Sequence, residues 1–304
     1  MAENNRHNRT KITAHEIRSG YLFLIPAFVG LTVLTYGPLI AVFFLSVFDT
    51  GGLILRLSFV GFQNYIRLFT EDPYFKDSIR VTAYYSVISV IGCMVYSLVV
   101  AMLLNRKVPA RGFFRAIFYL PYVLPAVAKY IGWAWLLDTN YGFFNYLLTL
   151  IGVSKIGFIA DSKMVVPSLA LIAVWNAGNL IVIYLAGLQN VPAVYHEAAQ
   201  IDGASVFQRF WHITIPCMTP IIFYNLLMAL IINLQVVTPA MALTSGGPGN
   251  SSRFLTYIMY QYGFMQSKFG YASAVSFIFF IIIAVFTGFL FGTSMKWVFY
   301  EGDR

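Results

Sequence analysis

The sequence predicts an all-α integral membrane protein of six transmembrane helices, and two observations lead to this fold class. The first is composition: 59% of the 304 residues are hydrophobic, only 11% are charged, and the mean hydropathy is +0.72. A soluble domain carries about a quarter charged residues. The second is length, because six apolar runs approach or exceed the roughly 20 residues needed to cross the hydrocarbon of a bilayer. Backbone groups cannot stay unpaired in lipid, so each run is expected to be helical.

The spans follow one another along most of the chain. They are predicted over residues 21–48, 79–104, 116–137, 164–187, 217–243 and 271–295. The first run is too long for a signal-peptide core and lacks a small-residue cleavage pattern behind it, so it is expected to be retained. Prolines within the spans are expected to kink or begin helices, which membrane bundles tolerate; these are Pro26, Pro38, Pro121, Pro125, Pro220 and Pro239. One domain over 21–295 is expected between tails at 1–20 and 296–304.

Basic residues in the short loops predict the orientation of the bundle. The N-terminal tail carries Arg6, Arg9, Lys11 and Arg18 against Glu3 and Glu16. The connection between the second and third spans contains basic residues and no acid, namely Arg106, Lys107, Arg111 and Arg115. The loop over 49–78 instead mixes both signs of charge, including Arg56 and Asp72. Both termini are therefore expected in the cytoplasm, with the loop over 188–216 on the same side and short interfacial helices in the external loops.

The spans are expected to form a transport pathway, but the sequence lacks the residues that would drive transport by ion coupling or by ATP hydrolysis. No Asp or Glu lies within the six spans, which argues against an ion-coupled carrier because such proteins place carboxylates in the membrane. A phosphate-binding GxxxxGK[ST] loop is also missing, and the glycines over 246–249 are not followed by Lys. The loop histidines His196 and His212 have no cysteine or clustered carboxylates beside them, so a metal or catalytic site is not expected. Cys93 and Cys217 lie in or beside apolar segments and indicate no disulfide framework.

The most informative polar segment lies between the fourth and fifth spans. It reads EAAQIDG over 197–203 and is followed by Pro216. Gly203 permits the positive φ of a turn after a short helix, and Glu197 near the start of that helix would suit the macrodipole. Ala198 and Ala199 would let a partner surface approach closely. By spacing alone, an ordinary polar loop with a solvated glutamate remains an equal alternative.

Four motifs in order give the chain its resemblance to a known family. Residues 197–216, EAAQIDGASVFQRFWHITIP, resemble the EAA loop of ABC importer permeases, with Ile215 in place of the usual Leu. Three further segments are similar to the carbohydrate branch of binding-protein-dependent permeases, of the maltose, multiple-sugar and glycerol-3-phosphate type. They are RGFFRAIFYLP (111–121), LTSGGPGNSS (243–252) and FGYASAVSF (269–277). The similarity covers nearly the whole chain after residue 20.

This resemblance implies a permease subunit of a bacterial ABC importer in the cytoplasmic membrane, without catalytic residues of its own. It implies a carbohydrate or a sugar or polyol phosphate as the solute, delivered by an extracytoplasmic solute-binding protein; an amino acid or peptide is the alternative. A second homologous permease and two ABC ATPase subunits would complete the assembly, with ATP and Mg bound only by the ATPases and no role for nucleic acid. The residues expected to couple transport to the ATPase are Glu197, Ala198, Ala199, Asp202, Gly203 and Pro216, with Glu197 paired to a basic group there.

Polar residues inside the spans are the candidates for contact with the solute. The predicted set is Asn233, Gln235, Lys129, Asn176, Asn179, Trp133 and Trp175. Amides supply planar hydrogen-bonding groups and tryptophans, including Trp135, supply aromatic faces that suit sugars. The alternative is that the polar residues of these spans, Asn225 and Thr238 among them, bond between helices and that the aromatic residues are interfacial. Lys129 lies about 13 residues into the third span and would snorkel, bond a neighbouring carbonyl or meet the solute. In the last case an anionic sugar or a phosphorylated polyol is favoured.

Overall fold

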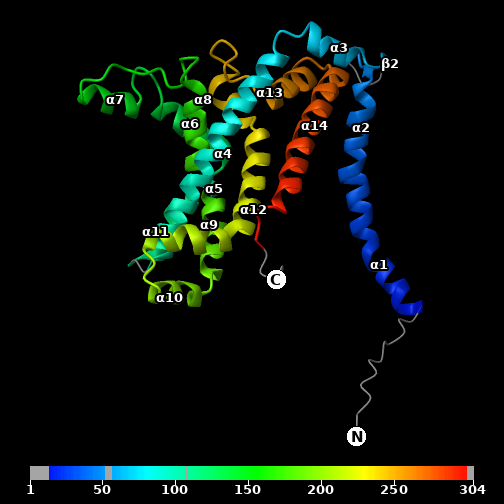
Figure 1. Cartoon of the computed structure of the whole chain (residues 1–304). Helices are drawn as coiled ribbons and strands as arrows, with labels where there is room; N and C mark the ends of the chain where they lie inside the picture. Colours follow the sequence, from blue (N-terminus) through cyan, green and yellow to red (C-terminus); the bar gives the residue numbers. More distant parts are fainter. Residues whose placement is uncertain (1–13, 52–56, 107–108, 300–304) are drawn as a thin grey trace.

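The structure is a computed structural model that describes residues 14–51, 57–106 and 109–299. Long helices run between two ends of the molecule (Figure 1): α3, α7 and α13 lie at the upper end, and α10 and α11 lie at the lower end. The start of α1 and the end of α14 also lie at the lower end. Arg6, Arg9, Lys11, Arg56, Lys107 and residues 300–304 of the predicted tails and loops lie outside the described residues.

Most elements are α-helices, several of which continue through a π-helical turn. The first long helix joins α1 (Ala14–Gly30), η1 (Leu31–Tyr36) and α2 (Gly37–Ser46). The remaining elements in chain order are β1 (Phe48–Asp49), β2 (Ser58–Phe59), α3 (Gln63–Thr70), α4 (Phe75–Asn105), α5 (Arg111–Val123), α6 (Ala126–Leu136), α7 (Phe143–Leu150), α8 (Val165–Trp175), α9 (Gly178–Asn190), α10 (Ala193–Ile201), α11 (Val206–Arg209), η2 (Phe210–Thr214), α12 (Ile215–Leu234), η3 (Ala240–Thr244), α13 (Leu255–Tyr260), η4 (Gln261–Met265) and α14 (Phe269–Ser294). The strands pair antiparallel with Phe48 opposite Phe59.

Among the described residues, four helices are long and apolar enough to cross a membrane: Arg18–Ser46, Phe75–Asn105, Val206–Leu234 and Phe269–Ser294. Helices α8 and α9 meet the same test as a pair bent by 47°, which raises the number to five. The third predicted span, over 116–137, is divided between α5 and α6 by Leu124 and Pro125. With 13 and 11 residues, neither piece alone reaches the length of a crossing.

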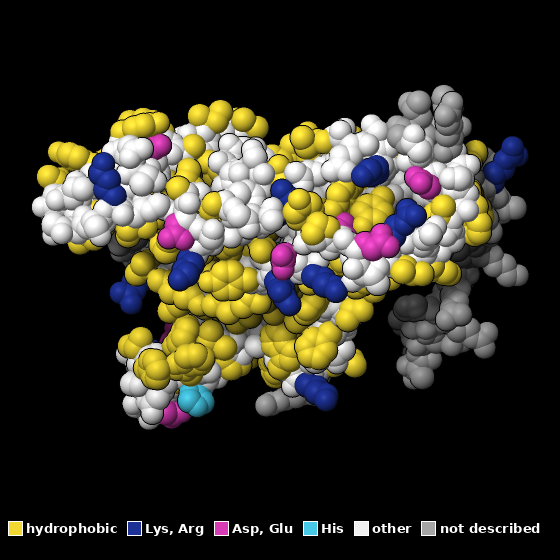
Figure 2. All heavy atoms as spheres, turned by 90° about the horizontal axis from the view of Figure 1, so that it is seen from above, with side chains coloured by type: hydrophobic (Ala, Val, Ile, Leu, Met, Phe, Trp, Pro, Cys, Tyr) yellow, Lys and Arg dark blue, Asp and Glu magenta, His cyan; other side chains and the backbone are white. Residues whose placement is uncertain are grey.

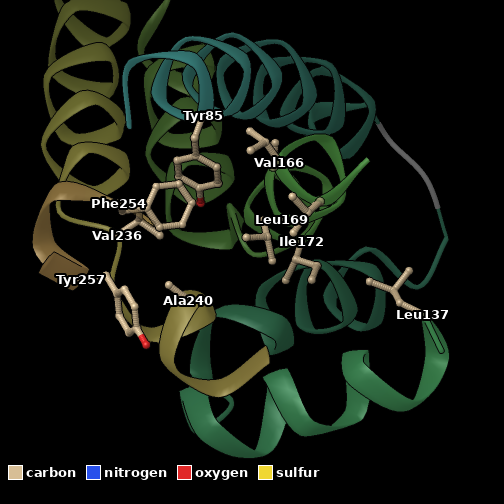
Figure 3. Packing of buried hydrophobic residues seen from close by; sticks show 11 residues of the cluster. Tyr85, Leu137, Val166, Leu169, Ile172, Val236, Ala240, Phe254 and Tyr257 are labelled. Atoms are coloured by element: carbon tan, nitrogen blue, oxygen red, sulfur yellow. The ribbon is translucent and has the colours of Figure 1, made fainter. Parts of the chain in front are cut away.

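Helix α4 lies at the centre of the packing. It contacts α8, α9 and α12, and its buried residues contribute to four hydrophobic clusters. In one cluster the ring of Tyr85 lies 5.0 Å from that of Phe254, next to Leu169 and Ile172 of α8 (Figure 3). The clusters are apolar, as expected for packing without water. The core of the molecule therefore forms around α4, where the second predicted span lies.

The first long helix stands apart from this core. None of the residues in its apolar window is buried, compared with 39% for α4. It meets the rest of the chain mainly where α2 packs against α14 at the upper end (Figure 1). There Gly270 approaches so closely that a Cβ atom would collide with the carbonyl oxygen of Phe48. Only glycine fits this junction between the first and last long helices.

Hydrogen bonds to Asp72 hold the upper end together. Its Oδ1 accepts the backbone N–H groups of Tyr74 and Phe75 at 2.8 and 2.9 Å, at the start of α4. Its Oδ2 accepts the hydroxyls of Tyr262 and Tyr271 at 2.7 and 2.8 Å. Burial and the hydrogen bond to Asp72 raise the pKa of Tyr262. Seen from this end (Figure 2), side chains of both charge signs lie among hydrophobic ones, which agrees with the mixed charge of the loop over 49–78.

Candidate functional site

A cavity of about 240 Å³ lies among the helices of the core. Four of the predicted solute contacts line it: Asn176, Asn179, Asn233 and Gln235. The rest of its wall is Tyr85, Cys93, Tyr122, Tyr130, Ala173, Ala177, Leu180, Ala229, Ile232, Val236, Val237, Thr238 and Pro239. The cavity thus combines amides, phenol rings and small apolar side chains from separate helices, which is the usual make-up of a small-molecule site.

Two helix ends bring the amides to this cavity. Helix α8 ends at Trp175, and Asn176 caps it before the chain bends into α9. Helix α12 ends at Leu234, which leaves 235–237 outside any helix where the fifth predicted span was expected to continue to 243. Asn233 is buried and donates from Nδ2 to the Ala229 carbonyl at 2.8 Å. Irregular backbone at membrane depth is tolerated where it lines a cavity, so both breaks suit a pathway.

The aromatic residues of the cavity are tyrosines and not the tryptophans of the predicted set. Trp133 and Trp175 pack edge to face with ring centroids 5.3 Å apart, and neither lines the cavity. Trp133 also stacks on Phe144 at 6.0 Å. Trp135 is 60% exposed. Tyr85, Tyr122 and Tyr130 supply the rings instead; they were missed because nothing in their spacing separates them from the many tyrosines of the chain.

Two other polar residues of the spans serve the packing. Asn225 is fully buried and donates from Nδ2 to the Leu180 carbonyl at 3.2 Å, which ties α12 to α9. Lys129 is 9% exposed on α6 and donates from Nζ to Asn176 Oδ1 at 2.5 Å and to the Pro121 carbonyl at 3.4 Å. It therefore lies one hydrogen bond behind the cavity wall, since Asn176 is part of that wall.

The EAAQIDG segment forms the second half of α10 and the turn that ends it, at the lower end of the molecule (Figure 1). Glu197 therefore lies in the middle of α10 and not near its start as expected, because the helix already begins at Ala193. Gly203 has φ +79°; its N–H donates to the Gln200 carbonyl at 3.2 Å, and the Ala204 N–H donates to the Ala199 carbonyl at 2.9 Å. This pair of bonds is a Schellman motif with glycine at its left-handed position. Ser205 then caps α11 in a reciprocal capping box with Gln208. Local bonds thus define the shape of the segment.

The surface of this segment is open. Helix α10 has no buried residue, and no basic group of the described chain lies within 4 Å of the Glu197 carboxylate. Apolar side chains around it are also exposed, namely Val194, Ile201, Val206, Phe207 and Trp211. Pro216 lies in the first turn of α12, directly after the π-helical turn η2 that joins α12 to α11. A charged group and an apolar rim without partners are typical of an interaction surface.

Comparison with known proteins identifies the family. Residues 78–298 match the model of the binding-protein-dependent transport system inner membrane component. The chain belongs to this family. Its members are permease subunits and not enzymes, and the multi-pass membrane character of the family agrees with the apolar helices described above. Among the described residues, no group of three or more His, Cys, Asp or Glu could hold a metal ion.

Individual family members resemble the chain over most of its length. The probable ABC transporter permease protein YesP of Bacillus subtilis is 35% identical over 94% of this chain and 93% of its own. The trehalose/maltose permease protein MalF of Thermococcus litoralis is 30% identical over 91% and 94%. The multiple sugar-binding permease protein MsmF of Streptococcus mutans is 33% identical over 88% and 91%. A chain of a bacterial alginate ABC transporter, solved with its pentasaccharide-bound periplasmic protein, has the same fold, with a TM-score of 0.80 at 22% identity over 93% of this permease and 97% of that chain.

Proposed function

We propose that this permease subunit carries a carbohydrate, or a sugar or polyol phosphate, across the bacterial cytoplasmic membrane in an ATP-driven importer. The cavity described above carries the proposal, because Asn176, Asn179, Asn233 and Gln235 converge with tyrosine rings on one small space. Planar amides and aromatic faces are the groups that bind sugar hydroxyls and sugar rings. The names of the relatives MalF and MsmF support a sugar as the solute.

The proposed topology has six spans with both termini in the cytoplasm. It takes α5 and α6 together as the third span and the bent pair α8 and α9 as the fourth. The start of α1, the end of α14 and α10 lie at one end of the molecule (Figure 1), as an even number of crossings requires. Arg106 and Arg111, between α4 and α5, would then face the cytoplasm in agreement with the positive-inside rule. Tails at 1–20 and 296–304 would flank the permease domain at 21–295, and the EAA loop would span 188–216.

The proposed coupling runs through one helix. Residues Val206–Leu234 form a continuous helical segment that begins beside α10 and ends at the cavity, next to Asn233 and Gln235. Force applied to α10 by an ATPase would reach α11 through the turn at Gly203 and the Arg209–Gln200 hydrogen bond of 3.3 Å. The same helix would then move Asn233 and Gln235. ATP binding and hydrolysis would thereby change which side of the membrane the cavity faces.

The full assembly would contain partners that match these surfaces. Two ABC ATPase subunits, which would bind ATP and Mg, would receive α10, and a second homologous permease would complete the pathway. An extracytoplasmic solute-binding protein would deliver the solute at the upper end. Glu197 would pair with a basic group of the ATPase, helped by Ala198 and Ala199, while Asp202, Gly203 and Pro216 would fix the shape of the loop. The chain itself would bind no cofactor and no nucleic acid.

Replacing Glu197 by Ala tests the coupling surface. The variant should reach the membrane in normal amounts, because the carboxylate has no partner within the described chain. ATP-dependent uptake should fall by about tenfold or more, the cost of one charged hydrogen bond. Glu71→Ala is the matched control, since Glu71 is also exposed but lies at the upper end. Equal uptake in Glu197→Ala and wild type would remove the coupling role.

The solute class is tested by uptake in cells that carry this chain and its neighbouring genes. Labelled maltose, a uronate disaccharide, a sugar phosphate, an amino acid and a dipeptide are compared with and without the chain. Chain-dependent accumulation of any sugar or sugar phosphate supports the proposal. Chain-dependent accumulation of only the amino acid or dipeptide overturns it.

A further inference from the structure

Lys129 is a buried cation whose charge has no counter-ion in the bundle. It is 9% exposed on α6, and no carboxylate of the described chain lies within 4 Å of its Nζ. The predicted spans contain no Asp or Glu from which such a partner could come. Its two hydrogen-bond acceptors, Asn176 Oδ1 and the Pro121 carbonyl, are neutral. An ionisable side chain in this position is costly, and proteins retain it for function.

The packing around Lys129 also explains part of its presence. Pro125 begins α6 and has no N–H group, so it cannot donate to the carbonyl of Pro121 four residues earlier. Lys129 Nζ donates to that carbonyl at 3.4 Å. A neutral donor such as Gln could do the same, so this hydrogen bond does not account for a positive charge. The ammonium also lies 5.8 Å from the centroid of the Tyr130 ring, a contact with an aromatic face that attracts a cation but supplies no negative charge.

The position of Lys129 connects that charge to the cavity. Its ammonium holds Asn176 Oδ1 at 2.5 Å, and Asn176 lines the cavity together with Tyr130, the neighbour of Lys129 on α6. Because Asn176 accepts through its oxygen, its amide N–H groups remain its means of donating to a solute. The charge of Lys129 behind the wall and the N–H groups of Asn176 on the wall both favour an anion in the cavity, because an N–H group binds an ionised acceptor more strongly than a neutral one.

From this geometry we propose that the solute of the cavity is an anionic carbohydrate. Its carboxylate or phosphate would lie against Asn176 and be held by the charge of Lys129, while Asn233, Gln235 and the tyrosine rings bind the neutral part. The proposal rests on the importer function proposed above and specifies its substrate class. Lys129 would be a specificity-determining residue that provides the missing counter-charge of the solute.

The experiment measures uptake in the native host, so that every partner subunit is present. Codons are replaced in the chromosome, and three radiolabelled probes are compared: digalacturonate for carboxylates, glucose 6-phosphate for phosphates and maltose as the neutral control. The wild type should accumulate at least one anionic probe. Lys129→Gln keeps the donor to Pro121 but removes the charge, and it should lower anionic uptake by about tenfold or more. Lys129→Arg keeps the charge and should retain most of the uptake.

Two further variants separate a lost charge from a lost fold. Lys155→Gln is the matched control, because Lys155 is exposed and likewise donates to a carbonyl, that of Asn140 at 2.8 Å; its uptake should equal wild type. Asn176→Asp gives Lys129 a counter-ion and so keeps the cation paired, yet it should abolish anionic uptake. Immunoblots of membranes report the amount of each variant. If Lys129→Gln does not reach the membrane, the anionic uptake of Asn176→Asp and Lys129→Arg tests the inference instead.

The outcomes distinguish this inference from the importer proposal. A wild type that accumulates maltose but neither anionic probe overturns the inference and leaves the importer standing. The same holds if Lys129→Gln or Asn176→Asp is present in the membrane and takes up the anionic probe at the wild-type rate. Failure of Glu197→Ala to lower uptake would instead contradict the importer mechanism. A wild type that accumulates none of the three probes also overturns the inference.

Discussion

Helices α7 and α10 are similar in size and sequence context but differ in how the molecule holds them. Each is a short helix between longer ones, and each ends in a Schellman motif with a glycine at positive φ, +76° at Gly152 and +79° at Gly203. Helix α7 is anchored by Asn145, which is 1% exposed. Helix α10 has no buried residue. The same local design therefore occurs once with a tertiary anchor and once without it.

The anchor of α7 is a set of four hydrogen bonds made by one side chain. Asn145 Nδ2 donates to the carbonyls of Asp138, Thr139 and Ile156, and its Oδ1 accepts the Ile156 N–H at 2.8 Å. The corresponding tie of α10 to the next helix is the single exposed bond between Arg209 and Gln200. The chain itself covers Asn145 of α7 but no residue of α10. This difference supports the proposal above that an ATPase covers α10.

Removing the anchor should have the largest effect on stability. Asn145→Ala leaves the Ile156 N–H and three carbonyls without their partner in a buried place, so the free energy of unfolding should fall by about 3 kcal/mol. Thermal unfolding of the purified protein in detergent measures this. Asn140→Ala, an exposed residue in the same loop, should change little. If the two variants unfold at the same temperature, α7 is not anchored by Asn145.

Substitution of Gly152 and Gly203, the glycines that end α7 and α10, should have the next largest effect. A Cβ at Gly203 or Gly152 meets nothing within 4 Å, so the main expected cost of Gly203→Val and of Gly152→Val is backbone strain at positive φ, about 1–2 kcal/mol each. Both should lower the unfolding temperature by similar amounts. Only Gly203→Val should also uncouple transport from ATP hydrolysis, because only it distorts α10. Uptake and ATPase activity in proteoliposomes test this, and equal transport by both variants would contradict the role of α10.

The smallest expected effect is a pH dependence near α7. The backbone N–H groups of Asn140 and then Tyr141 hold the pKa of Asp138 below its ordinary value. A carboxylate with a lowered pKa stabilises the folded state above the unfolded pKa of about 3.9 and loses this contribution as pH falls through the folded pKa. Asp138→Asn should therefore unfold slightly earlier than wild type near neutral pH and equally at lower pH. A difference that grows on acidification would contradict this assignment.

Much of the bundle could be predicted because lipid leaves few choices of structure. Apolar length identified α4, α14 and the first long helix to within several residues. It also identified α12, but this helix ends at Leu234 and not at 243 as predicted. The positions where a span is interrupted or bent were harder to predict. Pro125 indicated the division of α5 from α6, but the bend of α8 and α9 has no proline. It coincides with Gly178, where a Cβ would lie 2.9 Å from the Phe118 carbonyl oxygen, so tertiary contact produces it.

The candidate site was predictable where it depends on local chemistry. Gly203 indicated the turn, and the amides of the broken helices do meet in one cavity. The tyrosines were not predictable, since Tyr85, Tyr122 and Tyr130 come together only through the packing of separate helices. The same packing turns Trp133 and Trp175 toward each other and away from the cavity wall. Local signals define a turn, but only the assembled bundle decides which rings line the cavity.

The contact between Gly270 and the Phe48 carbonyl has a consequence for motion. There is no room for even a methyl group between them. The beginning of α14 and the end of the first long helix should therefore move as one rigid unit. The free lower part of that helix would then pivot about this junction, relative to the lower part of α14, whenever the pathway changes state. Spectroscopic probes on Ser46 and Tyr271 should keep their separation through a transport cycle, while probes near Leu22 and Gly288 should drift apart and return.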